Sequence, residues 1–212
     1  MDPASPPCVY LIDDDEFILR SLERLLAATA YQVRAFSRAE SFLQTADIHR
    51  PGCIILDLSM PGMPGPALQE HLLRCGSLLT VIFLTGNGDV ANSVKAMKLG
   101  AFDFFTKPVD APALLDAVRL AVAANAQLLA DRALVAAIER RMAGLTQRER
   151  QVMDLVVAGR LNKQIAAELG TVEHTIKLHR ASVMRKMQAG SLSDLVTAVN
   201  TLRHLRPQSR DV

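Results

Sequence analysis

Short apolar runs alternate with amphipathic stretches over the first two thirds of the chain. Five runs, most of them rich in Val, Ile or Phe, are typical of buried strands and lie at Val9–Ile12, Val33–Phe36, Cys53–Leu56, Val81–Leu84 and Phe102–Thr106. Helical patterns separate them, at Phe17–Ala28, Ala39–Gln44, Pro66–Cys75, Val90–Leu99 and from Ala111 onward. Because parallel strands joined by helices form right-handed crossovers, this alternation predicts a doubly wound α/β sheet with helices on both faces.

The last of these helical patterns continues well beyond the fifth predicted strand. Its apolar face runs from Leu114 to Ile138, and no Gly or Pro occurs between Ala113 and Ala143. We therefore expect a first domain over residues 7–125 and an extended helical linker over residues 126–142. The apolar stripe of such a linker requires a partner, either in the same chain or in a second protomer.

Strand-like patterns are absent after Gly144, where four helical patterns follow. The first begins with Thr146-Gln147-Arg148-Glu149, a capping box in which the Thr hydroxyl and the Glu carboxylate satisfy free amides, and it ends at Gly159. The others are Asn162–Leu169, Glu173–Met187, and a helix that begins after Ser191 and ends near Pro207. The sequence therefore predicts an all-α second domain over residues 143–205.

Charge divides the chain in the same place. The 212 residues have a formal net charge of +2, which hides an uneven distribution. Residues 1–120 hold 10 Lys and Arg against 14 Asp and Glu, whereas residues 121–212 hold 14 against 8. The basic second half favours binding to nucleic acid or to another acidic partner.

Secretory and membrane proteins are the classes that the sequence argues against. The first residues lack the basic and apolar regions of a signal peptide, and acidic and basic side chains interrupt the most apolar segment, Ala111–Ile138. Cys8, Cys53 and Cys75 form no CxxC pair, so we expect reduced thiols rather than a disulfide or a zinc site. These features predict a cytoplasmic protein with no membrane partner.

Reactive side chains follow four of the predicted strands. Asp13-Asp14-Asp15 follows the first strand, Asp57 the third, Thr85 the fourth and Thr106-Lys107-Pro108 the fifth. Ligand sites of open α/β sheets lie at the carboxyl ends of the strands, so we expect these groups to converge if the strands are neighbours. Closely packed carboxylates repel one another, and their oxygens favour a hard cation such as Mg²⁺. In such a site Asp57 can attack phosphorus and form an aspartyl phosphate, while the cation and Lys107 neutralise the phosphoryl oxygens.

The segments that carry these groups resemble the receiver domain of two-component response regulators, over about residues 7–125. They are Ile12–Asp15, Leu56–Met63, Leu84–Gly86 and Phe104–Pro108. The resemblance implies a flavodoxin-like receiver, with a five-stranded parallel sheet in the order 2-1-3-4-5. It also implies that Asp57 is the phospho-acceptor and that a sensor histidine kinase is the phosphoryl donor.

The same resemblance implies a role for each neighbour of Asp57. Mg²⁺ or Mn²⁺ would be held by Asp14 and Asp57 directly, by Asp13 through water and by the Ser59 carbonyl. Thr85 and Lys107 would contact the phosphoryl group, with a cis peptide between Lys107 and Pro108. Phe104 would be the aromatic side chain that changes rotamer after Thr85 does.

The second domain carries the features of a helix-turn-helix. Ala166 is small enough for two helices to approach, and Gly170 permits the turn between them. Apolar side chains that can form the shared core are Ile165, Leu169, Val172, Ile176, Val183 and Met187. A different face of the helix Glu173–Met187 would enter the major groove and carries His174, Lys177, Leu178, Ala181 and Arg185. Basic side chains that flank this face and suit phosphates are Lys163, Arg180 and Lys186.

Three segments of this domain resemble the effector domain of LuxR/FixJ/NarL-type regulators. They are Leu145–Glu149, Asn162–Ala166 and Thr175–Arg180. By this resemblance Lys177 and Leu178 lie where relatives touch bases. Ala181 stands where some relatives have a second Lys that reads a base. The DNA sequence that this domain recognises therefore does not follow from the sequences that those relatives recognise.

The whole chain is accordingly expected to be a response regulator that binds promoter DNA, with no enzymatic activity beyond phosphoryl uptake and autodephosphorylation at Asp57. Phosphorylation would favour a homodimer, and RNA polymerase is an expected partner. One alternative is a Mg²⁺-dependent phosphatase that uses an aspartyl phosphate, because Asp13 and Asp15 form a DxD pattern. Another keeps the receiver but gives the helices a protein- or RNA-binding role.

Overall fold

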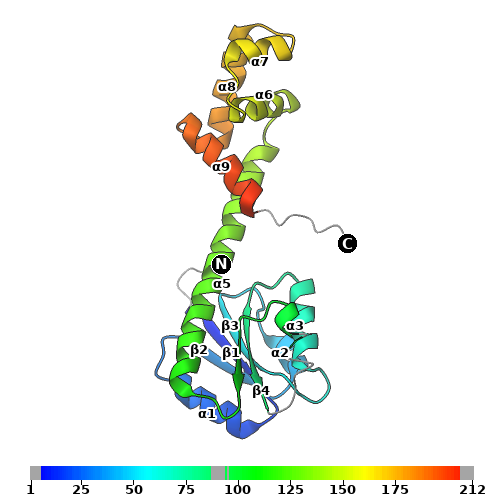
Figure 1. Ribbon diagram of the computed structural model, residues 1–212, viewed down its shortest axis with the longest axis vertical. Coiled ribbons are helices and arrows are strands. Elements are labelled where there is room, and N and C mark those ends of the chain that lie inside the picture. Colours follow the sequence, from blue (N-terminus) through cyan, green and yellow to red (C-terminus); the bar gives the residue numbers. More distant parts are fainter. Residues whose placement is uncertain (1–5, 87–93, 95, 206–212) are drawn as a thin grey trace. The chain divides into compact units, whose positions relative to one another are not determined.

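The structure is a computed structural model that describes residues 6–86, 94 and 96–205 (Figure 1). The described chain divides into two compact units, Met1–Leu129 and Ala130–Val212. Each unit has its own hydrophobic core, and the long helix α5 (Ala111–Ala143) contributes residues to both units.

The first unit is built on a five-stranded sheet in the order β2-β1-β3-β4-β5, with every neighbouring pair parallel. Its strands are β1 (Cys8–Ile12), β2 (Gln32–Phe36), β3 (Gly52–Asp57), β4 (Thr80–Thr85) and β5 (Asp103–Thr106). Its other helices are α1 (Glu16–Leu26), α2 (Ala39–Thr45) and α3 (Gly65–Arg74). The predicted sheet is confirmed, both in its parallel strands and in the order that the resemblance implied.

Strict alternation of side chains explains why helices cover both faces of this sheet. In β1, Tyr10 and Ile12 point into the core formed with α2 and α3, whereas Val9 and Leu11 point into the core formed with α1 and α5. Central strands buried on both faces need apolar residues at every position, and β1 and β3 are buried throughout. Figure 1 shows α2 and α3 on one side of the strands and α1 and α5 on the other.

The predicted helix Val90–Leu99 lies largely outside the described residues. Its described part at 96–98 is helical, and Ala96 is buried against the α2–α3 face of the sheet. The predicted strand Phe102–Thr106 is one residue shorter, because β5 begins at Asp103.

A buried amide anchors α5 to the amino-terminal edge of the sheet. Asn125 is 1% exposed; its Oδ1 accepts a hydrogen bond from the backbone N–H of Gly52 at 2.9 Å, and its Nδ2 donates to the Leu78 carbonyl at 2.5 Å. Thr80 adds a third link by donating to the Ala121 carbonyl at 3.0 Å. A Cβ on Gly52 would lie 1.8 Å from the Cys8 carbonyl oxygen, so only glycine permits this close approach of the two strands.

Helix α5 is also the one helix in the described part of the chain that is long and apolar enough to cross a bilayer by length and composition alone. Leu114, Val118 and Ala121 are nevertheless buried in the core of the first unit, and Ile138 in that of the second. The helix therefore contributes to both folded cores and is not a membrane span.

The second unit contains four helices after α5. They are α6 (Gln147–Val157), α7 (Asn162–Glu168), α8 (Glu173–Met187) and α9 (Leu192–Leu205). The predicted capping box is present, since Thr146 accepts from the Glu149 N–H and the Glu149 side chain accepts from the Thr146 N–H. The core of this unit includes Ile165, Ile176 and Val183, which fixes α7 and α8 as a helix-turn-helix pair.

Replacing Asn125 tests how much its buried amide stabilises the first unit. Asn125→Ala leaves the Gly52 N–H and the Leu78 carbonyl without their partner, so we expect a loss of about 1–3 kcal/mol in the free energy of unfolding. Urea denaturation followed by circular dichroism measures this loss, and hydrogen exchange should show a less protected Gly52 amide. The exposed change Arg119→Ala on the same helix is the control, with an expected effect below about 0.5 kcal/mol. Equal stabilities for the two variants would contradict the anchoring role.

Candidate functional site

The carboxyl ends of four strands bring together the residues that the sequence placed at one edge of the sheet. Lys107 Nζ lies 2.7 Å from Asp13 Oδ2 and 2.9 Å from Asp57 Oδ1, so one ammonium bridges carboxylates from the ends of β1 and β3. Asp13 is 1% and Asp57 5% exposed, whereas Asp14 is exposed. This arrangement forms an acidic pocket, with two buried carboxylates inside and a third at its mouth.

Burial and pairing act in opposite directions on the charges of this pocket. Burial raises the pKa of Asp13, and the bonds from Lys107 and from the Asp15 N–H only partly offset that increase. Burial would lower the pKa of Lys107, but its bonds to Asp13 and Asp57 outweigh burial and raise it. Lys107 therefore remains cationic at neutral pH and holds the two carboxylates in place.

The donor atoms of the pocket suit a hard divalent cation. Asp13, Asp14 and Asp57 each offer a carboxylate oxygen, and these atoms all lie within 4.8 Å of one another. Three carboxylates against one ammonium leave an excess of negative charge, which a divalent cation would neutralise. Because Asp14 is exposed, a cation bound there keeps access to water, as Mg²⁺ does in sites of this kind.

The remaining predicted pocket residues lie at or near the carboxyl ends of β3, β4 and β5. Thr85 is 9% exposed and donates its hydroxyl to the neighbouring Gly86 carbonyl at 3.0 Å. Phe104 stacks on Phe83 with ring centroids 5.4 Å apart and an interplanar angle of 17°. The peptide bond from Lys107 to Pro108 is cis, as the resemblance implied. Ser59 is exposed and follows Asp57 by two residues.

Two contributors to the pocket were not identified from the sequence. A Cβ on Gly65 would lie 2.5 Å from the Asp57 carbonyl oxygen and 2.8 Å from the ring of Phe83, so glycine alone lets α3 start this close to Asp57. The run Pro-Gly-Met-Pro-Gly-Pro at residues 61–66 was the available signal. Phe83 gave no signal, because it looks like any other apolar strand residue.

Helix α8 presents two faces, as its sequence predicted. Ile176, Val183 and Met187 are buried in the core of the second unit. Every residue predicted for the groove-facing side is exposed, namely His174, Lys177, Leu178, Ala181 and Arg185. Lys177 Nζ lies 3.7 Å from Glu173 Oε1 in an exposed pair, which is weak and leaves the ammonium available to a stronger acceptor.

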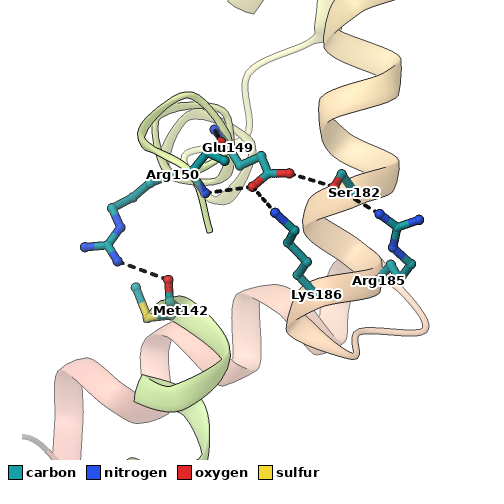
Figure 2. Close-up of polar contacts among 7 residues, drawn as sticks. Met142, Glu149, Arg150, Ser182, Arg185 and Lys186 are labelled. Atoms are coloured by element: carbon teal, nitrogen blue, oxygen red, sulfur yellow. Dashed lines mark hydrogen bonds and ion pairs between the residues drawn. The ribbon is translucent and has the colours of Figure 1, made fainter. Parts of the chain in front are cut away.

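The three basic side chains predicted to flank that face differ in their contacts. Lys163 is exposed. Arg180 donates to Asn162 Oδ1 at 2.8 Å, and Lys186 Nζ lies 2.6 Å from Glu149 Oε2 (Figure 2). Arg180 and Lys186 therefore have internal partners, which they would have to release before contacting a phosphate.

Glu149 combines its capping role with a second role that the sequence did not reveal. Its Oε2 accepts from Lys186 and from the Thr146 N–H, and its Oε1 accepts from the Ser182 hydroxyl at 2.6 Å (Figure 2). The bonds from Lys186, Ser182 and the Thr146 amide, in that order of size, lower the pKa of Glu149 from its ordinary value of 4.5 to about 2. This carboxylate therefore joins the start of α6 to the middle and end of α8.

Comparison with known proteins gave matches over both units. A family described as "Response regulator receiver domain" matches residues 9–119, and one described as "Bacterial regulatory proteins, luxR family" matches residues 143–199. The chain is 40% identical over 195 residues to the response regulator protein TodT of Pseudomonas putida, which covers 92% of this chain and 86% of TodT. It is 42% identical over 194 residues to the transcriptional regulatory protein FixJ of Azorhizobium caulinodans, covering 92% of each chain.

Solved structures agree with these matches. The response regulator StyR superposes with a TM-score of 0.82 at 39% identity, covering 92% of this chain and 99% of StyR. Full-length FixJ from B. japonicum gives a TM-score of 0.59 at 37% identity, covering 95% of this chain and 99% of that one.

Magnesium titration tests whether the acidic pocket holds a cation. A cation that binds only the folded pocket stabilises it by mass action, by about 2.7 kcal/mol at 100 times the dissociation constant. We expect MgCl₂ to raise the melting temperature of the first unit and Asp14→Asn to abolish that increase. Asp15→Asn is the matched control, because Asp15 accepts from the Phe17 N–H to cap α1 and Asn caps equally well. An increase that persists in Asp14→Asn, or that disappears in Asp15→Asn as well, would contradict this cation site.

Acid unfolding tests the role of Glu149 in the second unit. Because folding lowers its pKa from 4.5 to about 2, its stabilising contribution is complete above about pH 4.5 and is lost as the pH falls toward 2. The stability difference between the wild type and Glu149→Gln should therefore shrink over this pH interval. Urea denaturation at several pH values measures the difference, and a difference that is constant from pH 7 to pH 2.5 would exclude the proposed charge pairing.

Proposed function

The chain belongs to the response regulators that join a receiver domain to a regulatory domain of the luxR family, and we propose that it is a transcriptional regulator whose DNA binding is controlled by phosphorylation of Asp57. The observation that carries this proposal is the acidic pocket, where Lys107 bridges Asp13 and Asp57 beneath the exposed carboxylate of Asp14. We divide the chain into a receiver over residues 7–125, a linker over residues 126–142 and a DNA-binding domain over residues 143–205.

The input step transfers a phosphoryl group from a histidine of a sensor kinase. A carboxylate oxygen of Asp57 attacks the phosphorus, the P–N bond breaks, and the imidazole of the kinase retains the electron pair. Lys107 lies close enough to pair with the phosphoryl oxygens. Asp14, Asp57 and the Ser59 carbonyl would hold Mg²⁺ or Mn²⁺ directly and Asp13 through water, and the cation would supply further positive charge to those oxygens.

The new negative charge then biases a two-state element. Thr85 ends β4 beside the pocket, and its hydroxyl bond to the Gly86 carbonyl is a local one that a phosphoryl oxygen can replace. Phe104 follows by changing its rotamer, which alters the surface around β5 and the Val90–Leu99 segment. That surface favours a homodimer in the phosphorylated state.

The output is binding of the paired α8 helices to duplex promoter DNA in the cytoplasm. The exposed face of α8 supplies the contacts to bases and backbone, through His174, Lys177, Leu178, Ala181 and Arg185. Lys163 is free to contact a phosphate, whereas Arg180 and Lys186 support α8 from within the domain. Half-sites lie about one helical turn apart, and RNA polymerase is a further partner at the promoter.

The two alternative functions have less support. A phosphatase of the DxD type needs the second Asp as an acid, but Asp15 accepts from the Phe17 N–H at 2.8 Å and caps α1. The family to which the chain belongs consists of regulators rather than conventional enzymes. The other alternative is that α8 binds RNA or a protein. Electrophoretic retardation of duplex promoter DNA, with an affinity that falls steeply as salt is added, would favour DNA binding over this alternative.

Labelling with acetyl phosphate tests the phospho-acceptor. We expect one phosphoryl group per wild-type chain and none in Asp57→Asn, because the amide is not a nucleophile toward phosphorus. Sedimentation should show a larger dimer fraction for the phosphorylated wild type. Persistent labelling of Asp57→Asn would refute the assignment of the acceptor. Identical sedimentation of the phosphorylated and unphosphorylated wild type would contradict the proposed coupling to dimerisation.

Replacing Lys177 tests the groove-facing side of α8. If its ammonium reads a base, Lys177→Ala should weaken binding to a selected duplex by about 1–3 kcal/mol and relax specificity at one position. Electrophoretic retardation against a library of single-base variants measures both effects. Lys98→Ala in the receiver is the control for a lost positive charge, and unchanged affinity and specificity in Lys177→Ala would contradict the base contact.

A further inference from the structure

The flank of α8 that faces α6 is held by a single carboxylate. Glu149 accepts from Ser182 through one oxygen and from Lys186 through the other, both at 2.6 Å (Figure 2). Ser182 and Lys186 are one helical turn apart, so the two bonds restrain both the rotation of α8 about its axis and its position along α6. Glu149 is 5% exposed, which limits the access of water to its carboxylate.

Ser182 connects this carboxylate to the exposed side of α8. Its hydroxyl donates to Glu149, so its lone pairs remain free to accept, and Arg185 Nη2 lies 3.5 Å from the same oxygen (Figure 2). A hydroxyl that donates to a carboxylate is a stronger acceptor than a free one, because hydrogen bonds in a chain polarise one another. The long distance to Arg185 is that of a weak bond, and the guanidinium has further N–H donors, so Arg185 can contact a phosphate oxygen while it keeps this bond.

We propose that Glu149 and Ser182 are positioning residues for DNA binding, which hold Arg185 ready to contact the DNA backbone, and that Lys186 is an internal counter-ion of Glu149 rather than a DNA contact. This inference rests on the proposed DNA-binding function. Its physical reason is that an exposed Arg loses side-chain entropy when it binds, and a partner that already restrains it reduces that loss. Lys186 neutralises the charge of the buried Glu149 carboxylate and so stabilises the domain, whereas Arg185 is reached only through the Ser182 hydroxyl.

A double-mutant cycle between Ser182 and Arg185 tests the connection. Full-length chains are titrated with a duplex that the wild type selects from a random-sequence pool, at several salt concentrations and at a temperature where circular dichroism shows every variant folded. We expect Ser182→Ala to weaken binding about 2- to 10-fold, because the 3.5 Å contact with Arg185 is that of a weak hydrogen bond. In the Arg185→Ala background the same change should have no further effect, and Ser182→Thr should retain wild-type affinity because it keeps the hydroxyl.

The salt dependence separates Arg185 from Lys186. Arg185→Ala should lower the salt slope by about 1, as the loss of one phosphate contact does, and Lys186→Met should leave the slope unchanged while lowering the melting temperature. An equal loss from Ser182→Ala in both backgrounds, or no loss in either, overturns the positioning role. A reduced slope in Lys186→Met overturns its assignment as a counter-ion. A wild-type chain that binds no duplex would instead refute the proposed function, so the two failures are distinguishable.

Discussion

The account depends on the bridge that Lys107 forms between Asp13 and Asp57. The three side chains come from the ends of three different strands, so the bridge exists only because β1, β3 and β5 are held in one parallel sheet. Like charges repel, and three clustered carboxylates against one ammonium leave an excess of negative charge. Such an excess favours a divalent cation, and the cation together with Lys107 would then offset the charge of the proposed phosphoryl group.

Buried polar side chains fix a helix in each of the two units. Asn125 anchors α5 at the opposite edge of the sheet, where it bonds to the backbone of residues 73 and 47 positions away in sequence. Glu149 plays a comparable role for α8 in the second unit. Each replaces a flexible junction by a specific set of hydrogen bonds, because leaving any of these groups unpaired in the interior would cost more than the bond itself contributes. Each unit therefore has a helix that is fixed by a buried polar side chain.

Much of this was accessible from the sequence, and the remainder was missed for identifiable reasons. The periodicity of the strands predicted the parallel sheet, and the residues at the strand ends predicted that Asp13, Asp57, Thr85 and Lys107 lie together. The strand order came from the family resemblance. Local patterns also predicted the capping box at Thr146 and the buried face of α8, because both depend on spacings of a few residues. Lys163 and Lys186 were indistinguishable in sequence; only the fold brings Glu149, 37 residues away, to Lys186. The same holds for Asn125, whose partners Gly52 and Leu78 are brought to it only by the fold.

The central claim is that charge captured at Asp57 changes the affinity of α8 for DNA. Its most direct test is to measure binding of the intact chain to its selected duplex with and without beryllofluoride and Mg²⁺, which together mimic the bound phosphoryl group. A coupling between two sites typically amounts to about 5- to 150-fold in affinity, and we expect tighter binding of that order that is lost when Mg²⁺ is chelated. Equal affinity in the two conditions, from a chain that binds the duplex well in both, would contradict the claim.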